Sequence, residues 1–152
     1  LKASIRHHVR HGGKVYAEGA GAAYLCQWME IRPGQFIRGV GLFSAAGRRL
    51  PRFGDPMPVS VTTTRTTWLA ERGTILRGYR SPEWWFQPEA LSAPLIAEPG
   101  FEYDVLGNER VVASAVHLDF SVHPELLASF FTSRYEPRSL SRVESSATHP
   151  QI

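Results

Sequence analysis

Residues 111–122 read VVASAVHLDFSV, and this stretch decides the fold class. The even-numbered positions are apolar except for Ser114, while the odd-numbered positions include the polar His117 and Asp119. Alternation of this kind is typical of a β-strand with one buried face, because successive side chains of a strand point to opposite faces. The stretch therefore predicts one long strand.

The sequence around this stretch predicts more strands and few helices. Residues 101–105 alternate in the same way, and Gly107-Asn108 lies between the two runs, as in a β-hairpin. A helix is predicted from Pro124, where leucine and phenylalanine recur at helical spacing. The remaining predicted strands lie at 5–10, 14–18, 35–43, 58–67 and 74–80, and at 24–31, which also fits a helix.

These segments predict a mainly β protein, either an antiparallel sandwich or a jelly-roll-like barrel, with one short C-terminal helix. The length of 152 residues favours a single domain. We place this β-rich domain at residues 1–135. A polar C-terminal arm without periodicity follows at residues 136–152.

The composition limits the compartment only weakly. No apolar run approaches the ~20 residues of a membrane span, and the chain does not open on a secretory signal. We therefore expect a soluble protein without membrane contact. A single cysteine, Cys26, excludes an internal disulfide framework but suits several compartments, so the localisation stays open.

Charge is sorted along the chain. Residues 1–52 carry nine basic and two acidic side chains, whereas residues 81–125 carry one basic and eight acidic side chains. If the fold keeps the two blocks apart, each block attracts a partner of the opposite charge.

The catalytic candidates are Cys26, His117 and Asp119. A cysteine beside a histidine can act as a nucleophile, and a carboxylate can orient that histidine. His117 and Asp119 are two positions apart, so on a strand their side chains point the same way. The sequence does not show that the three meet, and we favour the alternative of a solvated His–Asp pair and a buried cysteine.

The sequence predicts no metal site and no cofactor. His7 and His11 are four residues apart and could share a metal on a helix, but their segment reads as a strand, on which they are too far apart. Gly19-Ala20-Gly21 lacks the third glycine of a dinucleotide loop. We interpret residues 19–23 as a flexible turn between strands.

Two further groups are candidates for binding. The aromatic run Trp84-Trp85-Phe86 alternates, so one side can enter the core while the other side needs a cover from a loop or a partner. The candidates for binding an anion or a partner are the basic residues Arg6, Arg10, Lys14, Arg48, Arg49 and Arg52.

Segregated charge, a polar arm and an incomplete catalytic set together predict a structural or assembly subunit. Such a subunit binds partner protein chains and forms a homo- or hetero-oligomer, for example in a viral or phage particle. The first alternative is a nucleic-acid-binding β module that uses the N-terminal arginines, and the second is a small Cys/His enzyme. Size-exclusion chromatography at low and high salt, with and without nucleic acid, distinguishes an assembly subunit from a nucleic-acid-binding module.

Overall fold

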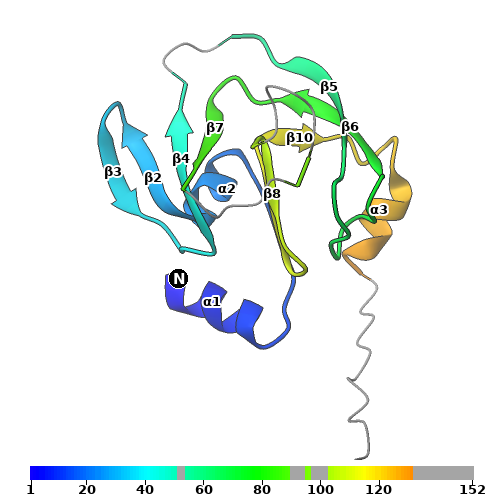
Figure 1. The fold of residues 1–152 in the computed structure, drawn as a ribbon, viewed down its shortest axis with the longest axis horizontal. Helices are drawn as coiled ribbons and strands as arrows, with labels where there is room; N and C mark the ends of the chain where they lie inside the picture. Colours follow the sequence, from blue (N-terminus) through cyan, green and yellow to red (C-terminus); the bar gives the residue numbers. More distant parts are fainter. Residues whose placement is uncertain (51–53, 90–94, 97–102, 132–152) are drawn as a thin grey trace, which may run out of the picture.

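A computed structural model describes residues 1–50, 54–89, 95–96 and 103–131 (Figure 1). The described elements are, in chain order, α1 (Lys2–Arg10), β1 (Val15–Glu18), α2 (Gly19–Leu25), β2 (Cys26–Arg32), β3 (Gln35–Arg38), β4 (Phe43–Arg49), β5 (Met57–Thr62), β6 (Ile75–Arg80), β7 (Trp84–Pro88), β8 (Val105–Gly107), β9 (Val111–Ser114), β10 (Val116–Leu118) and α3 (Pro124–Ser129). None of these helices has the length and apolar character of a membrane-spanning helix.

The described strands form three sheets, in the orders β1-β9-β8, β10-β6-β5 and β3-β2-β4-β7. The protein is therefore mainly β, as predicted, and consistent with a β-sandwich. Two pairings, β1 with β9 and β2 with β4, are parallel, so two of the three sheets are mixed, whereas the β10-β6-β5 sheet is antiparallel. Helix α2 lies between the four-stranded sheet and the β1-β9-β8 sheet (Figure 1).

The stretch at residues 111–122 is not one long strand, and this prediction is wrong. Its first half is β9, which is buried along its whole length between β1 and β8, and its second half is β10, which pairs with β6 in another sheet. The chain changes sheets at Ala115. The Ser114 hydroxyl stabilises this corner by accepting from the Val116 N–H at 3.0 Å and donating to the Val116 carbonyl. A local side-chain hydrogen bond thus replaces ladder bonds where the strand breaks.

Two segments predicted as non-helical are helices. Residues 5–10 belong to α1 because Ile5 and Val9, four apart, pack together against the core. Residues 19–23 form α2 rather than a flexible turn. Its Ala23 lies so close to β4 that a Cβ at Gly47 would be only 2.4 Å from the Ala23 Cβ. Small residues on both sides allow this close helix–sheet contact.

Several predicted elements are confirmed. β8 and β9 form the expected hairpin, and β5 pairs with β6 antiparallel. The ambiguous segment at 24–31 is mostly strand β2, and the helix from Pro124 is α3. The predicted strand at 35–43 is divided between β3 and the start of β4. The polar arm at 136–152 lies outside the described residues.

The aromatic run in β7 alternates as predicted, with Trp84 and Phe86 buried and Trp85 half-buried. Trp84 and Phe86 belong to a core cluster that includes α2 and parts of β2, β4 and β9. A second cluster lies between the β10-β6-β5 sheet and the opposite side of β9. Strand β9 contributes to both clusters, which explains why it is buried on both faces.

The fold does not keep the two charge blocks apart. Strand β4, in the basic block, is hydrogen-bonded to β7 in the acidic block, and β1 is likewise paired with β9. The expected spatial separation of charge is therefore wrong, because pairing between strands distant in sequence interleaves the two blocks.

Candidate functional site

A sharp turn joins the end of strand β1 to the start of helix α2. Gly19 makes this turn with a φ of +54°, in the left-handed region that favours glycine. A Cβ at this position would lie 3.7 Å from His117 Cε1 and 3.9 Å from Trp84 Cδ1. A strained strand-to-helix turn is the geometry in which hydrolases present a catalytic nucleophile. A side chain at position 19 would therefore lie beside a histidine, as a catalytic nucleophile lies beside its general base.

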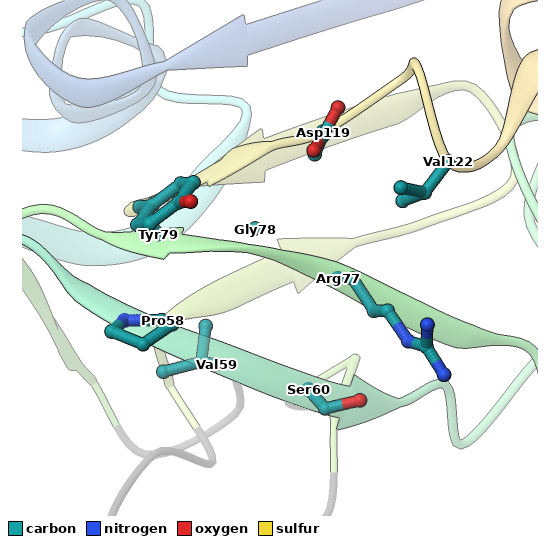
Figure 2. A pocket seen from close by; sticks show the side chains of 8 residues that line it. All are labelled: Pro58, Val59, Ser60, Arg77, Gly78, Tyr79, Asp119 and Val122. Atoms are coloured by element: carbon teal, nitrogen blue, oxygen red, sulfur yellow. The ribbon is translucent and has the colours of Figure 1, made fainter.

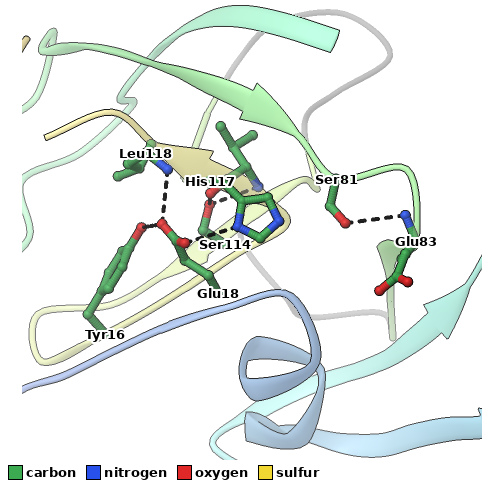
Figure 3. A network of polar contacts seen from close by, with 8 residues as sticks. Tyr16, Glu18, Ser81, Glu83, Ser114, His117 and Leu118 are labelled. Atoms are coloured by element: carbon green, nitrogen blue, oxygen red, sulfur yellow. Dashed lines mark hydrogen bonds and ion pairs between the residues drawn. The ribbon is translucent and has the colours of Figure 1, made fainter. Parts of the chain in front are cut away.

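His117, at the middle of β10, is oriented by a carboxylate from the neighbouring β1. Its Nδ1 lies 3.0 Å from Glu18 Oε2, and the side chains of His117 and Glu18 are 50% and 27% exposed (Figure 3). Because a carboxylate only accepts hydrogen bonds, Nδ1 is the donor to Glu18, and in the neutral form of the ring Nε2 is the acceptor. This is the arrangement of a general base held in one tautomer by an acid.

Glu18 is itself held by two donors. Its Oε1 accepts hydrogen bonds from the Leu118 N–H at 2.9 Å and from the Tyr16 hydroxyl (Figure 3). Burial, and then the hydrogen bond to Glu18, raise the pKa of Tyr16 far above its ordinary value. Tyr16 therefore remains protonated and continues to donate to Glu18.

The site has a base and an orienting acid, but residue 19 has no side chain. Gly19 offers no oxygen or sulfur atom that could attack a substrate and form a covalent intermediate. The space that such a side chain would take up is bordered by the His117 and Trp84 rings at ordinary van der Waals distance. Without such an atom, the arrangement lacks the attacking group of a nucleophilic enzyme.

The structure does not assemble the predicted Cys26, His117 and Asp119 set. Cys26 is buried, its thiol donates a 3.7 Å hydrogen bond to the Ala22 carbonyl, and burial raises the pKa of the thiol to about 12. It lies seven residues along the chain from Gly19, about 10 Å along α2. Such a thiol is a poor nucleophile.

Asp119 does not orient His117 either. Its carboxylate accepts hydrogen bonds from the Ser121 N–H at 2.9 Å and from the Ser121 hydroxyl, and these bonds hold the pKa of Asp119 below its ordinary value. The orienting role falls to Glu18. Sequence reasoning missed Glu18 because this residue is far from His117 along the chain. The signal that could have pointed to Glu18 was its position directly before Gly19 and a short helix.

The predicted basic binding residues are mostly engaged within the molecule. Arg6 Nε donates to the Val40 carbonyl at 2.6 Å, and Arg48 donates to Gln87 and lies over the Phe36 ring. Two more lie over indole rings, Lys14 over Trp68 and Arg49 over Trp84. Arg10 is exposed, and Arg52 lies outside the described residues. An anion site made from these residues stays a prediction.

Within the described part of the chain, no group of three or more histidine, cysteine, aspartate or glutamate side chains could hold a metal ion. Two hollows of the described residues are lined by neither Gly19 nor His117. One, of about 340 Å³, is on the outer face of β5 and β6 (Figure 2), and another, of about 830 Å³, lies beside Trp68 and α3.

Comparison with known proteins gives a likeness of fold. No protein-family model matches the sequence, and no curated protein matches it. A crystal structure of a glutamine amidotransferase superposes with a TM-score of 0.60 at 19% sequence identity. The match covers 86% of this chain and 68% of the amidotransferase chain. The two proteins share a fold.

Proposed function

We propose that this chain is an amidotransferase-like domain that has lost its side-chain nucleophile. It acts by binding rather than by catalysis, as one component of a complex with a partner protein. The observation that carries the proposal is the position of Gly19 at the sharp β1–α2 turn. A Cβ added to Gly19 would lie 3.7 Å from His117 Cε1. The fold resembles that of a glutamine amidotransferase, which supports an ancestry in amide chemistry. The residue at the turn determines what the site can do.

Loss of the nucleophile removes covalent catalysis and leaves the rest of the site in place. His117 keeps its carboxylate, and Glu18 keeps its two donors. Removing one partner of any of these hydrogen bonds would leave a polar group unsatisfied in a partly buried site, which costs free energy. Selection on binding or on local structure is therefore enough to retain the network without hydrolysis.

Strand β1 supports the partner-binding part of the proposal. Among the described residues it is an edge strand of the β1-β9-β8 sheet, with a strand partner on one side only, and its four residues are half-buried. The unpaired side of an edge strand can accept a further strand. Strand β1 ends directly before the Gly19 turn, so a polypeptide bound there would border the candidate site.

The proposal is tested by restoring a nucleophile. Wild-type protein should release no ammonia from glutamine above the buffer rate. The Gly19→Cys variant should be alkylated by iodoacetamide at position 19 about tenfold faster than an ordinary thiol, because a neighbouring histidine lowers a thiol pKa. Alkylation sites are read by peptide mass spectrometry, with the buried Cys26 as the slow internal reference.

Two variants control this test. Adding His117→Ala to Gly19→Cys should remove the rate advantage. Gly21→Cys lies in the same helix, where its Cβ would meet Ala17, so its alkylation should not respond to His117. Ammonia release by the wild-type protein that disappears in His117→Ala would show an active hydrolase and refute the proposal.

A further inference from the structure

His7 of helix α1 and His11, the C-cap residue of this helix, are exposed to solvent on the side away from the core. Ile5 and Val9 pack against the core, and successive residues of a helix are about 100° apart around its axis. His7 and His11 therefore point roughly opposite to Ile5, and both are exposed. Residues four apart on a helix are surface neighbours, so the two imidazoles share one patch.

The two rings are close together. Their centroids are 3.9 Å apart and the ring planes are tilted by 32°. His11 Nδ1 lies 2.8 Å from the His7 carbonyl oxygen. Because a carbonyl only accepts, Nδ1 of His11 is the protonated nitrogen and Nε2 keeps its lone pair. Metal-binding histidines are commonly oriented in this way, with the second ring nitrogen donating to a carbonyl.

We propose that His7 and His11 form a two-histidine clamp for a divalent first-row transition metal such as Ni²⁺, Cu²⁺ or Zn²⁺. Imidazole nitrogen suits these ions, whereas Mg²⁺ and Ca²⁺ prefer oxygen ligands, and the sequence of α1 contains no carboxylate. Water fills the other coordination positions, so the metal is exchangeable and accessible to an outside donor.

Charges around the clamp limit its affinity. Arg10 is on the neighbouring face of α1, and Arg6 lies beyond it, where its guanidinium is bound to the Val40 carbonyl. Both oppose a dication. The clamp is therefore weaker than a closed four-ligand site, and Cu²⁺ should bind more tightly than Ni²⁺ or Zn²⁺.

The third histidine of the segment is a matched control. His8 is on another side of α1, and its Nε2 lies 3.3 Å from the Lys14 carbonyl oxygen. Its ring also packs over Gly13, where an added Cβ would be 2.2 Å from the His8 Nε2. These contacts direct His8 toward the α1–β1 connection rather than toward the clamp.

Calorimetric titration of tag-free protein with Ni²⁺ at about pH 7.5, where imidazoles are mostly neutral, tests the proposal. One site should appear in the wild-type protein. His7→Ala and His11→Ala should each weaken binding about tenfold or more, since a chelate becomes a contact with one imidazole. His8→Ala should change the affinity less than about twofold, within the scatter expected of a residue outside the clamp.

A spectroscopic readout completes the test. With Cu²⁺, the electron paramagnetic resonance spectrum should show coupling to two imidazole nitrogens in the wild-type protein and to one in each single variant. Circular dichroism should be unchanged, because the two rings face solvent. Equal Ni²⁺ affinity in wild type, His7→Ala and His11→Ala, or a loss confined to His8→Ala, would overturn the clamp. Neither result would bear on the Gly19 site.

Discussion

Gly19 shows how one residue can decide the chemistry of a site. Its φ of +54° requires a backbone conformation that most side chains avoid, and its missing side chain leaves His117 without a nucleophile to activate. Glycine is the residue for which this backbone conformation costs least.

The backbone conformation of Gly19 gives a stability prediction. Gly19→Ala should lower the free energy of unfolding by about 1–2 kcal/mol, because a Cβ is disfavoured in the left-handed region. Gly21→Ala, in the same helix with no positive φ and with only an ordinary contact to Ala17, should raise it by about 0.5–1 kcal/mol. Chemical denaturation of the two variants measures both values. Equal effects of the two substitutions would contradict the assigned turn geometry.

At the level of the elements, the buried carboxylate of Glu30 links strand β2 by hydrogen bonds to the turn before β3 and to the end of β4. Glu30, on β2, accepts a hydrogen bond from the Gly34 N–H at 2.7 Å, in the turn to β3, and another from the Arg49 N–H at 3.0 Å, at the end of β4. The bond from Gly34 is the main cause that lowers the pKa of Glu30. The bond from Arg49 and the nearby Arg48 and Arg49 charges also lower this pKa, and burial opposes them.

This carboxylate makes the stability depend on pH. Because the pKa of Glu30 is lower in the folded than in the unfolded state, its contribution is complete above the unfolded value and is lost as the pH falls through the folded value. Glu30→Gln should cost about 1.5–3 kcal/mol at neutral pH, typical of hydrogen bonds to a charged group. It should also flatten the loss of stability on the acid side. Denaturation midpoints across the acid range measure both effects, and parallel curves for the two proteins would refute this role.

At the scale of the whole molecule, an ion pair links two of the three sheets. Arg80, on β6, donates through Nε to Asp104 Oδ2 at 2.5 Å and through Nη2 to Asp104 Oδ1 at 3.2 Å. Asp104 directly precedes β8 and is 4% exposed. A fork of this kind fixes orientation as well as distance, so it sets how the β10-β6-β5 sheet meets the β1-β9-β8 sheet.

Arg80→Met should lower the free energy of unfolding by about 3–5 kcal/mol, because it leaves the Asp104 carboxylate buried without this partner. Arg77→Met, on the exposed face of the same strand, should change it by less than about 0.5 kcal/mol. Replacing both Arg80 and Asp104 by apolar residues should recover part of the loss. Thermal or urea unfolding of the four proteins checks the prediction, and a small effect of Arg80→Met would show that packing alone joins the sheets.

Local patterns predicted the elements that depend on neighbouring residues. The β8–β9 hairpin around Asn108, the β5–β6 pair, the alternation of Trp84 and Phe86, and α3 were all predictable from spacing and turn chemistry. The errors arose where tertiary contacts overrode the local pattern. A periodic run was divided between two sheets at Ala115, and α1 and α2 became helices because Ile5, Val9 and Ala23 pack against strands from elsewhere.

The mainly β class, several strand pairs and the supply of histidines, carboxylates and one thiol can be inferred from the order of residues alone. Which of these side chains meet depends on the tertiary fold. Gly19 and Glu18 are about a hundred residues from His117 along the chain, and the β1–β9 pairing together with the switch into β10 makes them neighbours. Spacing along a chain encodes contacts within one element, whereas a site shared between sheets depends on strand order and register, which arise from packing of the whole core.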